Sequence, residues 1–183
     1  MAGADNWEIA EQVRAFGGNL RRARLSAGYT QADLSSATEA QVSPPVPIDR
    51  AAISRLECGE RAPDMPTLLR ICAALELGPD ELLRGVGPRG SPREGPSRAD
   101  RLVSNPAAMF GVNLRWARIR AGISQERLAL DAKVDRAAIS VYENGRREPN
   151  LRTVLKLALK LEVRPGLLLD GIAWTGQATD SNG

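Results

Sequence analysis

Apolar residues in the second half of the chain recur every three or four positions, in short blocks separated by polar residues and glycines. Phe110, Leu114 and Ala117 form one block, and Val154 and Leu157 belong to another. This spacing places side chains on one face of a helix, so the blocks predict short amphipathic helices. The alternation of apolar and polar residues that indicates a strand is absent, and we expect an all-α fold.

The residues between these blocks are typical of helix ends. Ser124 and Asp135 are suited to the N-cap position, where a side-chain oxygen accepts a hydrogen bond from a free backbone N–H. Gly122 and Gly145 are suited to the turn that ends a helix. These boundaries predict five short helices, of which the fourth covers residues 153–161.

The first half of the chain carries a similar sequence. Nine of the thirteen residues of Phe16–Gly28 recur 94 residues later in Phe110–Gly122, and Asp49–Ser54 recurs unchanged 86 residues later as Asp135–Ser140. The difference between the two offsets means that the first copy contains eight more residues. They fall within residues 38–47, between the second and third helices, where a run of prolines predicts a loop.

The duplication predicts two tandem domains of five helices each. Repeat 1 covers residues 1–83 and repeat 2 covers residues 106–171, with a linker at 84–105 and a C-terminal tail at 172–183. The linker is rich in Gly, Pro and Arg, which predicts a flexible segment with a reach of about 25 Å. That reach is comparable with one turn of DNA, about 34 Å.

Part of repeat 2 resembles a known family of DNA-binding proteins. Ser124–Ala129, Ile139-Ser140, Glu143–Arg147 and Pro149 are similar to the helix-turn-helix signature of the Cro and phage-repressor (XRE) family, and repeat 1 carries a related signature. The resemblance implies a lambda-repressor-like fold. It also implies that the second helix lies over the DNA backbone while the third enters the major groove.

The resemblance further implies which side chains face DNA. In repeat 2 they are Gln125, Arg136, Ala137, Ser140, Val141, Asn144, Arg146 and Arg147. In repeat 1 they are Gln31, Arg50, Ala51, Ser54, Arg55 and Arg61. The glutamines are expected at phosphates, the first arginine of each third helix at a guanine edge, and Ala137 or Val141 at a thymine methyl group.

The two repeats differ at some of these positions. Repeat 1 has Arg55 where repeat 2 has Val141, so we expect half-sites that share some bases and differ in others. Repeat 1 also has Cys58 and Glu60 where repeat 2 has residues expected at phosphates, and it retains only Arg61 there. The eight-residue insertion next to the third helix of repeat 1 raises the question of whether that helix keeps the docking angle of the family. The insertion is either a surface expansion or a loop that reaches the phosphates or a partner protein.

Two charged pairs resemble the ion pair that joins the first and third helices in this family. They are Arg24 with Glu57 and Arg118 with Glu143. We expect these four residues to hold the fold together rather than to contact DNA.

Charge is distributed unevenly between the repeats. Residues 16–83 hold seven basic and nine acidic residues, whereas residues 110–171 hold twelve basic and seven acidic ones. Basic residues that neutralise phosphates release counterions, so repeat 2 is expected to supply most of the non-specific affinity for DNA.

The composition argues against several classes of function. The chain has no histidine, and its cysteines are only Cys58 and Cys72, which we expect to be structural or buried thiols. No standard zinc site or Ser/His or Cys/His nucleophile can be assembled from these residues, so we expect neither an enzyme nor a metal or other cofactor. We see no membrane-spanning run, secretion signal, small-molecule domain or protease domain, and expect a cytoplasmic, nucleoid-associated protein.

Apolar residues near the two ends suggest further packing. Trp7, Ile9 and Val13 predict an N-terminal extension of the first helix that covers part of repeat 1. Trp174 in the tail is expected to pack on the core or against a second chain.

These features predict a sequence-specific regulator of transcription that binds double-stranded DNA, with a repressor favoured and a bipartite site read by both repeats. An alternative is an antitoxin-like module in which repeat 1 binds a protein partner and only repeat 2 reads DNA. A homodimer or a regulatory partner protein remains open.

Overall fold

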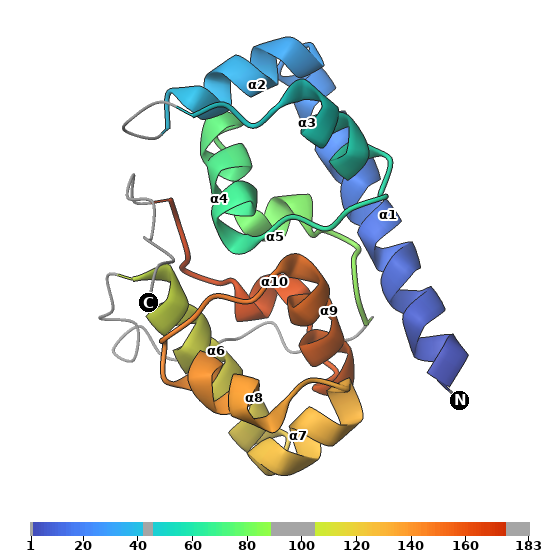
Figure 1. Ribbon diagram of the computed structural model, residues 1–183, viewed down its shortest axis with the longest axis vertical. Helices are drawn as coiled ribbons and strands as arrows, with labels where there is room; N and C mark the ends of the chain where they lie inside the picture. Colours follow the sequence, from blue (N-terminus) through green and yellow to red (C-terminus); the bar gives the residue numbers. More distant parts are fainter. Residues whose placement is uncertain (1, 42–45, 89–104, 175–183) are drawn as a thin grey trace.

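The computed structural model describes residues 2–41, 46–88 and 105–174, and these residues contain ten α-helices and no strand (Figure 1). The helices of repeat 1 are α1 (Ala2–Ser26), α2 (Gln31–Glu39), α3 (Arg50–Glu57), α4 (Met65–Ala74) and α5 (Pro79–Leu82). Those of repeat 2 are α6 (Pro106–Arg120), α7 (Gln125–Ala132), α8 (Arg136–Glu143), α9 (Leu151–Lys160) and α10 (Pro165–Leu168). The prediction of two tandem five-helix domains is confirmed.

The helices begin where polar caps satisfy their free N–H groups. The Ser124 hydroxyl accepts from Arg127 N at the start of α7, as expected. The fourth helix of repeat 2 was predicted to begin two residues too late, because α9 begins at Leu151 rather than Thr153. Asn150 precedes it and accepts from Thr153 N at 2.9 Å, so Asn150 is the cap that the apolar spacing alone did not identify.

The first and third helices of each repeat cross at a glycine. A Cβ on Gly17 would lie 2.5 Å from the carbonyl oxygen of Leu56, and one on Gly111 would lie 2.5 Å from that of Tyr142. No other residue fits at either position without moving the backbone. The first and third helices approach each other equally closely in both repeats. The insertion of repeat 1 therefore leaves the position of α3 against α1 unchanged.

One asparagine in each repeat ties the first helix to the end of the fifth. Asn19 Nδ2 donates to the carbonyl oxygens of Leu82 and Arg84, at 2.7 and 3.0 Å. Asn113 Nδ2 makes the equivalent bonds to Leu168 and Asp170, at 3.1 and 2.9 Å. The repeated asparagine of the sequence is therefore a structural residue.

The insertion of repeat 1 is closed at its base. Residues 46–49 are not helical, in agreement with the predicted loop, while residues 42–45 lie outside the described part. The buried Thr38 hydroxyl accepts from Ile48 N at 3.2 Å, and Arg70 of α4 donates to the Thr38 and Val46 carbonyl oxygens. These bonds return the chain to the start of α3.

The two repeats contact each other directly, which the sequence did not predict. Helix α1 lies against α9, and α5 lies against α10. Leu151 N donates to Pro63 O at 2.9 Å across the same boundary. At the start of the segment expected to be the linker, Val86 is buried and Gly87 lies against Pro165 of repeat 2.

The two terminal segments also differ in part from expectation. Ile9 and Val13 are buried, but α1 covers α9 of repeat 2 as well as elements of its own repeat. Trp7 is 64% exposed, so it is not part of this packing. Trp174 is half-buried and its Nε1 donates to Gln41 O at 2.6 Å, which joins the end of repeat 2 to the edge of the insertion.

Candidate nucleic-acid interface

Helices α3 and α8 turn their apolar sides inward and their candidate DNA-contacting residues outward. Ile53 and Ile139 are fully buried at equivalent positions. The predicted reading residues of these two helices are exposed or half-buried: Arg50, Ala51, Ser54 and Arg55 on α3, and Arg136, Ala137, Ser140 and Val141 on α8. Each set therefore lies together on one accessible helix face, which is the geometry that direct reading of base edges requires.

The cap of α8 differs from that of α3. Asp135 accepts from Ala137 N at 2.6 Å, which fixes the end of α8 that carries Arg136. Asp49 occupies the same position before α3, yet its side chain makes no capping hydrogen bond. The start of α3 is therefore less firmly held than the start of α8.

A buried ion pair holds each of these helices on the first helix of its repeat. Arg24 Nε lies 2.5 Å from Glu57 Oε1, and their side chains are 8% and 4% exposed. Arg118 and Glu143 repeat the contact at 2.5 Å. Hydrogen bonds to the glutamates raise the pKa of both guanidinium groups, against the lowering effect of burial. The two predicted ion pairs between the first and third helices are confirmed.

The glutamines expected at phosphates belong to the same networks. Gln31 Nε2 donates to Glu57 Oε2 at 3.0 Å, and Gln125 Nε2 donates to Glu143 Oε2 at 2.7 Å. Burial would raise the pKa of Glu57, but the hydrogen bonds from Arg24 and Gln31 outweigh it and lower that pKa. Each amide has a second N–H, so the bond to glutamate orients the glutamine without exhausting its donors.

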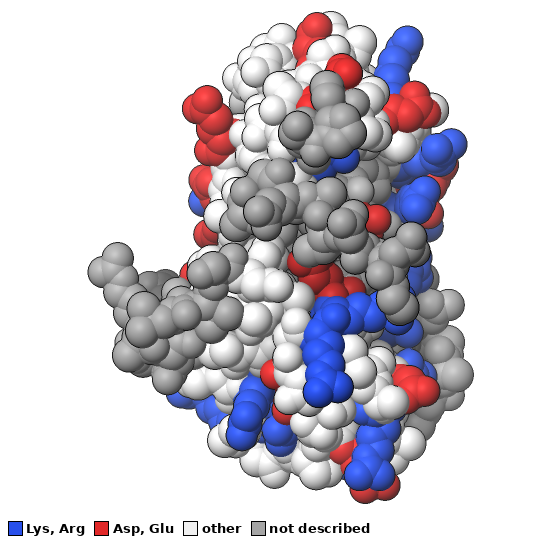
Figure 2. Space-filling view, turned by 60° about the vertical axis from the view of Figure 1, so that its left-hand side comes forward, with Lys and Arg blue, Asp and Glu red and all other residues white. Residues whose placement is uncertain are grey.

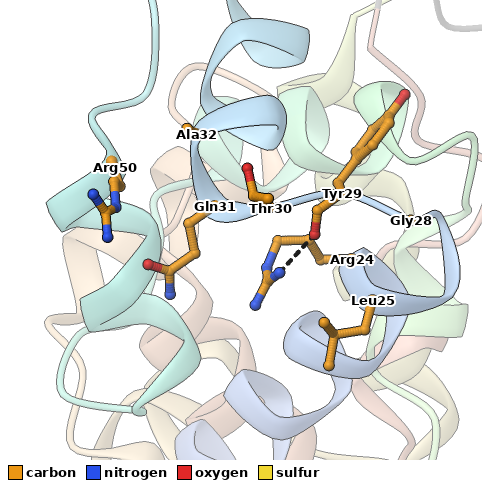
Figure 3. Close-up of a pocket in the computed structure, with 8 residues that line it drawn as sticks. All are labelled: Arg24, Leu25, Gly28, Tyr29, Thr30, Gln31, Ala32 and Arg50. Carbon is orange, nitrogen blue, oxygen red and sulfur yellow. Dashed lines mark hydrogen bonds between the residues drawn. The ribbon is translucent and has the colours of Figure 1, made fainter.

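An open hollow lies at the start of α2 and was not foreseen from the sequence. It has a volume of 610 Å³, and Figure 3 shows the side chains of Arg24, Gln31 and Arg50 extending into the same space. The free N–H groups at the start of a helix favour an anion, and Arg50 adds a positive charge, whereas the charge of Arg24 is already paired with Glu57. The hollow is therefore suited to an anionic group that lies between α2 and α3.

The turn after the third helix differs in charge between the repeats. In repeat 2 the turn contains Asn144, Arg146 and Arg147, all exposed, and Asn144 Nδ2 donates to Ser140 O at 2.8 Å. In repeat 1 the exposed Cys58 and Glu60 replace two of these residues. The exposed Arg61 remains in that turn.

The surface shows the same difference. Lys and Arg side chains gather over repeat 2, in the lower part of Figure 2. Over repeat 1, in the upper part, basic and acidic side chains lie interspersed.

The two cysteines have different surroundings. Cys72 is buried, and burial raises the pKa of its thiol to about 12. Cys58 is exposed, so the expectation of a buried or structural thiol is correct for Cys72 and wrong for Cys58.

The described residues contain neither a metal-binding cluster nor a membrane-spanning helix. No group of three or more acidic or cysteine side chains there could hold a metal ion. In the same part of the chain, no helix is both long and apolar enough to cross a membrane.

Comparison with known families matches both repeats independently. A model described as "Helix-turn-helix domain" matches residues 15–84, and one described as "Helix-turn-helix" matches residues 114–168. The first match spans the eight-residue insertion of repeat 1.

Two curated relatives align with about a third of the chain each. The SPbeta prophage-derived uncharacterized HTH-type transcriptional regulator YonR of Bacillus subtilis (strain 168) is 40% identical over 63 residues, which are 34% of this chain and 58% of the relative. The chain thus spans little more than half the length of that protein. The control protein C.BamHI of Bacillus amyloliquefaciens is 34% identical over 70 residues, which are 38% of this chain and 86% of the relative.

Two solved structures are also similar. The restriction-modification controller protein C.AhdI from Aeromonas hydrophila is 39% identical, with a TM-score of 0.33, over 34% of this chain and 94% of that one. The hypothetical transcription factor NHTF from Neisseria is 32% identical, with a TM-score of 0.35, over 43% of this chain and 85% of that one. The family matches, together with a relative aligned over most of its length, show that the chain belongs to the XRE-type helix-turn-helix family of DNA-binding transcription regulators and carries the domain of that family twice.

Proposed function

We propose that the protein is a repressor that binds one bipartite operator, with α3 and α8 in the major groove at two half-sites. The observation that carries this proposal is the duplication of the whole supporting frame. The same glycine crossing, asparagine tie and Arg–Glu–Gln network present an accessible face on α3 and on α8. Because both repeats have the same supporting contacts, we infer that the outward faces of α3 and α8 both bind DNA.

Base reading is assigned to the outward residues of the two helices. Arg50 and Arg136, at the first position of α3 and α8, are suited to the O6 and N7 acceptors of guanine. Ala137 and Val141 are suited to the thymine methyl group. Because Arg55 replaces Val141 in repeat 1, the two half-sites are expected to differ at the base that this position reads.

Phosphate contacts are assigned to the groups beside these helices. The hollow at the start of α2 would take a backbone phosphate against Gln31, and Gln125 has the equivalent place in repeat 2. In the turns after the third helices, we assign phosphates to Asn144, Arg146 and Arg147 of repeat 2 and to Arg61 of repeat 1. Such contacts fix the register of the protein on the duplex without reading sequence.

A second function is favoured by the charge difference between the repeats. Repeat 1 is net acidic and has Glu60 where repeat 2 has Arg146. A repeat of this kind could bind a protein partner while repeat 2 alone holds the operator, as in the antitoxin-like alternative.

Selection from random duplexes followed by arginine substitution separates these functions. Under the bipartite proposal, Arg50→Ala and Arg136→Ala each weaken binding to the selected site by about 1–3 kcal/mol and relax specificity in different half-sites. Arg115→Ala, at an exposed arginine of α6 outside the interface, is the matched control. An effect of Arg136→Ala alone would favour the partner-binding function for repeat 1. No preference among duplexes at physiological salt would contradict both functions.

A further inference from the structure

The contact between the repeats joins equivalent elements. Helices α5 and α10 are the fifth helices of their repeats, and they lie against each other. Within them, Asp80 and Gly166 occupy the same position, 86 residues apart. A Cβ on Gly166 would lie 3.0 Å from Asp80 Cβ and 3.2 Å from its Cα. A position that meets its own equivalent lies on a two-fold axis, so these two residues mark an approximate two-fold axis between the repeats.

Figure 1 shows the same relation for the ten helices. A half turn about the viewing direction carries α1 to α5 onto the places of α6 to α10 in order. In this view α3 lies in front of α1, and α8 lies in front of α6. Because α3 and α8 bury their sides against α1 and α6, their outward faces point to the same side of the molecule. Recognition helices related by a two-fold axis bind half-sites that have inverted orientation on the duplex.

Further contacts fix the repeats in this arrangement. Leu151 N donates to Pro63 O at 2.9 Å, and Trp174 Nε1 donates to Gln41 O at 2.6 Å. Helix α1 also lies against α9 of repeat 2. We call this set of contacts between the repeats the seam.

The seam favours the pairing of repeat 1 with repeat 2 over the pairing of two copies of repeat 1. Gly166 has no side chain, so the Asp80 backbone approaches it closely. Pairing two copies of repeat 1 in the same way would place Asp80 against Asp80, and two facing carboxylates repel. Linkage within one chain also raises the effective concentration of the correct partner to about the millimolar range.

We propose that the seam allows one chain to bind both half-sites of an operator by itself. Because the seam fixes the two repeats, the chain binds tightly only to duplexes that carry two unlike half-sites in inverted orientation at a single spacing. This inference rests on the proposed function, since it specifies which DNA the two reading faces accept together. It replaces the flexible tether expected from the linker composition, which would accept several spacings and both orientations.

A series of duplexes tests the restriction. The selected site is compared with versions in which about half a turn or about one turn of DNA is inserted between the half-sites, and with a version in which one half-site is reversed. A fixed seam lowers affinity for all three by about 100-fold or more, to that of a single half-site. Sedimentation should give one chain per duplex. Equal affinity across the series, or two chains per duplex, would overturn the proposal.

A variant of the seam supplies the matched comparison. Gly166→Asp places a second carboxylate against Asp80, while an aspartate in the first turn of α10 suits the helix itself. We expect the variant to keep its affinity for a single half-site and to lose its discrimination among spacings. The exchanged pair Asp80→Gly with Gly166→Asp restores one carboxylate opposite a glycine and should recover that discrimination. Discrimination that survives in Gly166→Asp contradicts a role for the seam.

A measurement without DNA separates failure of the seam from failure of the proposed function. Small-angle X-ray scattering should show a compact wild type and a larger radius of gyration for Gly166→Asp. A wild type as extended as the variant overturns the seam even if DNA binding is confirmed. A compact wild type that binds no duplex leaves the seam intact and contradicts the proposed function.

Discussion

The two repeats are nearly identical where they hold themselves together and differ where they face outward. Arg24 with Glu57 in repeat 1 and Arg118 with Glu143 in repeat 2 form the same ion pair at 2.5 Å. In contrast, the exposed turn after the third helix has Glu60 in repeat 1 and arginine in repeat 2. The comparison shows that the helix-turn-helix frame can be kept while the charge of its surface changes sign.

The first prediction tests whether the shared frame has the same energetic weight in both repeats. Arg24→Met leaves the Glu57 carboxylate buried without its partner, and Arg118→Met does the same to Glu143. Each should lower the free energy of unfolding by about 3–5 kcal/mol. Urea unfolding followed by circular dichroism measures both losses.

The control for this prediction removes both members of a pair. Arg24→Met with Glu57→Met leaves no unpaired buried charge and should recover most of the lost stability. If the single substitution lowers the free energy of unfolding much less in one repeat than in the other, the two ion pairs have the same geometry but contribute differently to stability.

The second prediction acts on the difference in surface charge. Glu60→Arg gives repeat 1 the residue that repeat 2 has at Arg146. If both repeats lie on DNA, affinity should rise by about 1 kcal/mol, and the slope of log K against log salt should steepen by about 0.9. Fluorescence anisotropy across a salt series measures both quantities.

A charge change elsewhere on repeat 1 is the matched control. Glu11→Arg makes the same change on the exposed part of α1, away from the candidate interface, and should leave the slope nearly constant. Equal effects of the two substitutions would mean that net charge, rather than a phosphate at this turn, governs the affinity.

The sequence predicted the frame better than the arrangement of the two domains. Duplicated residues such as Gly17 and Gly111 allowed each repeat to be recognised, and capping residues gave most helix boundaries. The bond between Gln125 and Glu143 was missed because it joins separate helices, and no local pattern records it. The contact of Asp80 with Gly166 was missed for the same reason.

The seam contains one further asymmetry between the repeats. Glu148 is half-buried before α9, whereas repeat 1 has Ala62 at the equivalent position. Burial raises the pKa of Glu148, and the carboxylate of Asp64 in repeat 1 raises it further. The folded state therefore binds the proton of this carboxyl group more tightly than the unfolded chain does.

A pKa raised by folding makes a contribution to stability that is complete below the ordinary glutamate pKa and is lost as the pH rises through the raised value. Glu148→Gln should therefore stabilise the protein at pH 7, by less than about 1 kcal/mol because the side chain is only half-buried. The gain should vanish near about pH 3.5, where the wild-type carboxyl is also neutral. Urea midpoints at the two pH values measure it, with Glu60→Gln as the exposed control. A gain that is the same at both pH values would contradict the electrostatic cause and leave side-chain packing at the seam as the source of the difference.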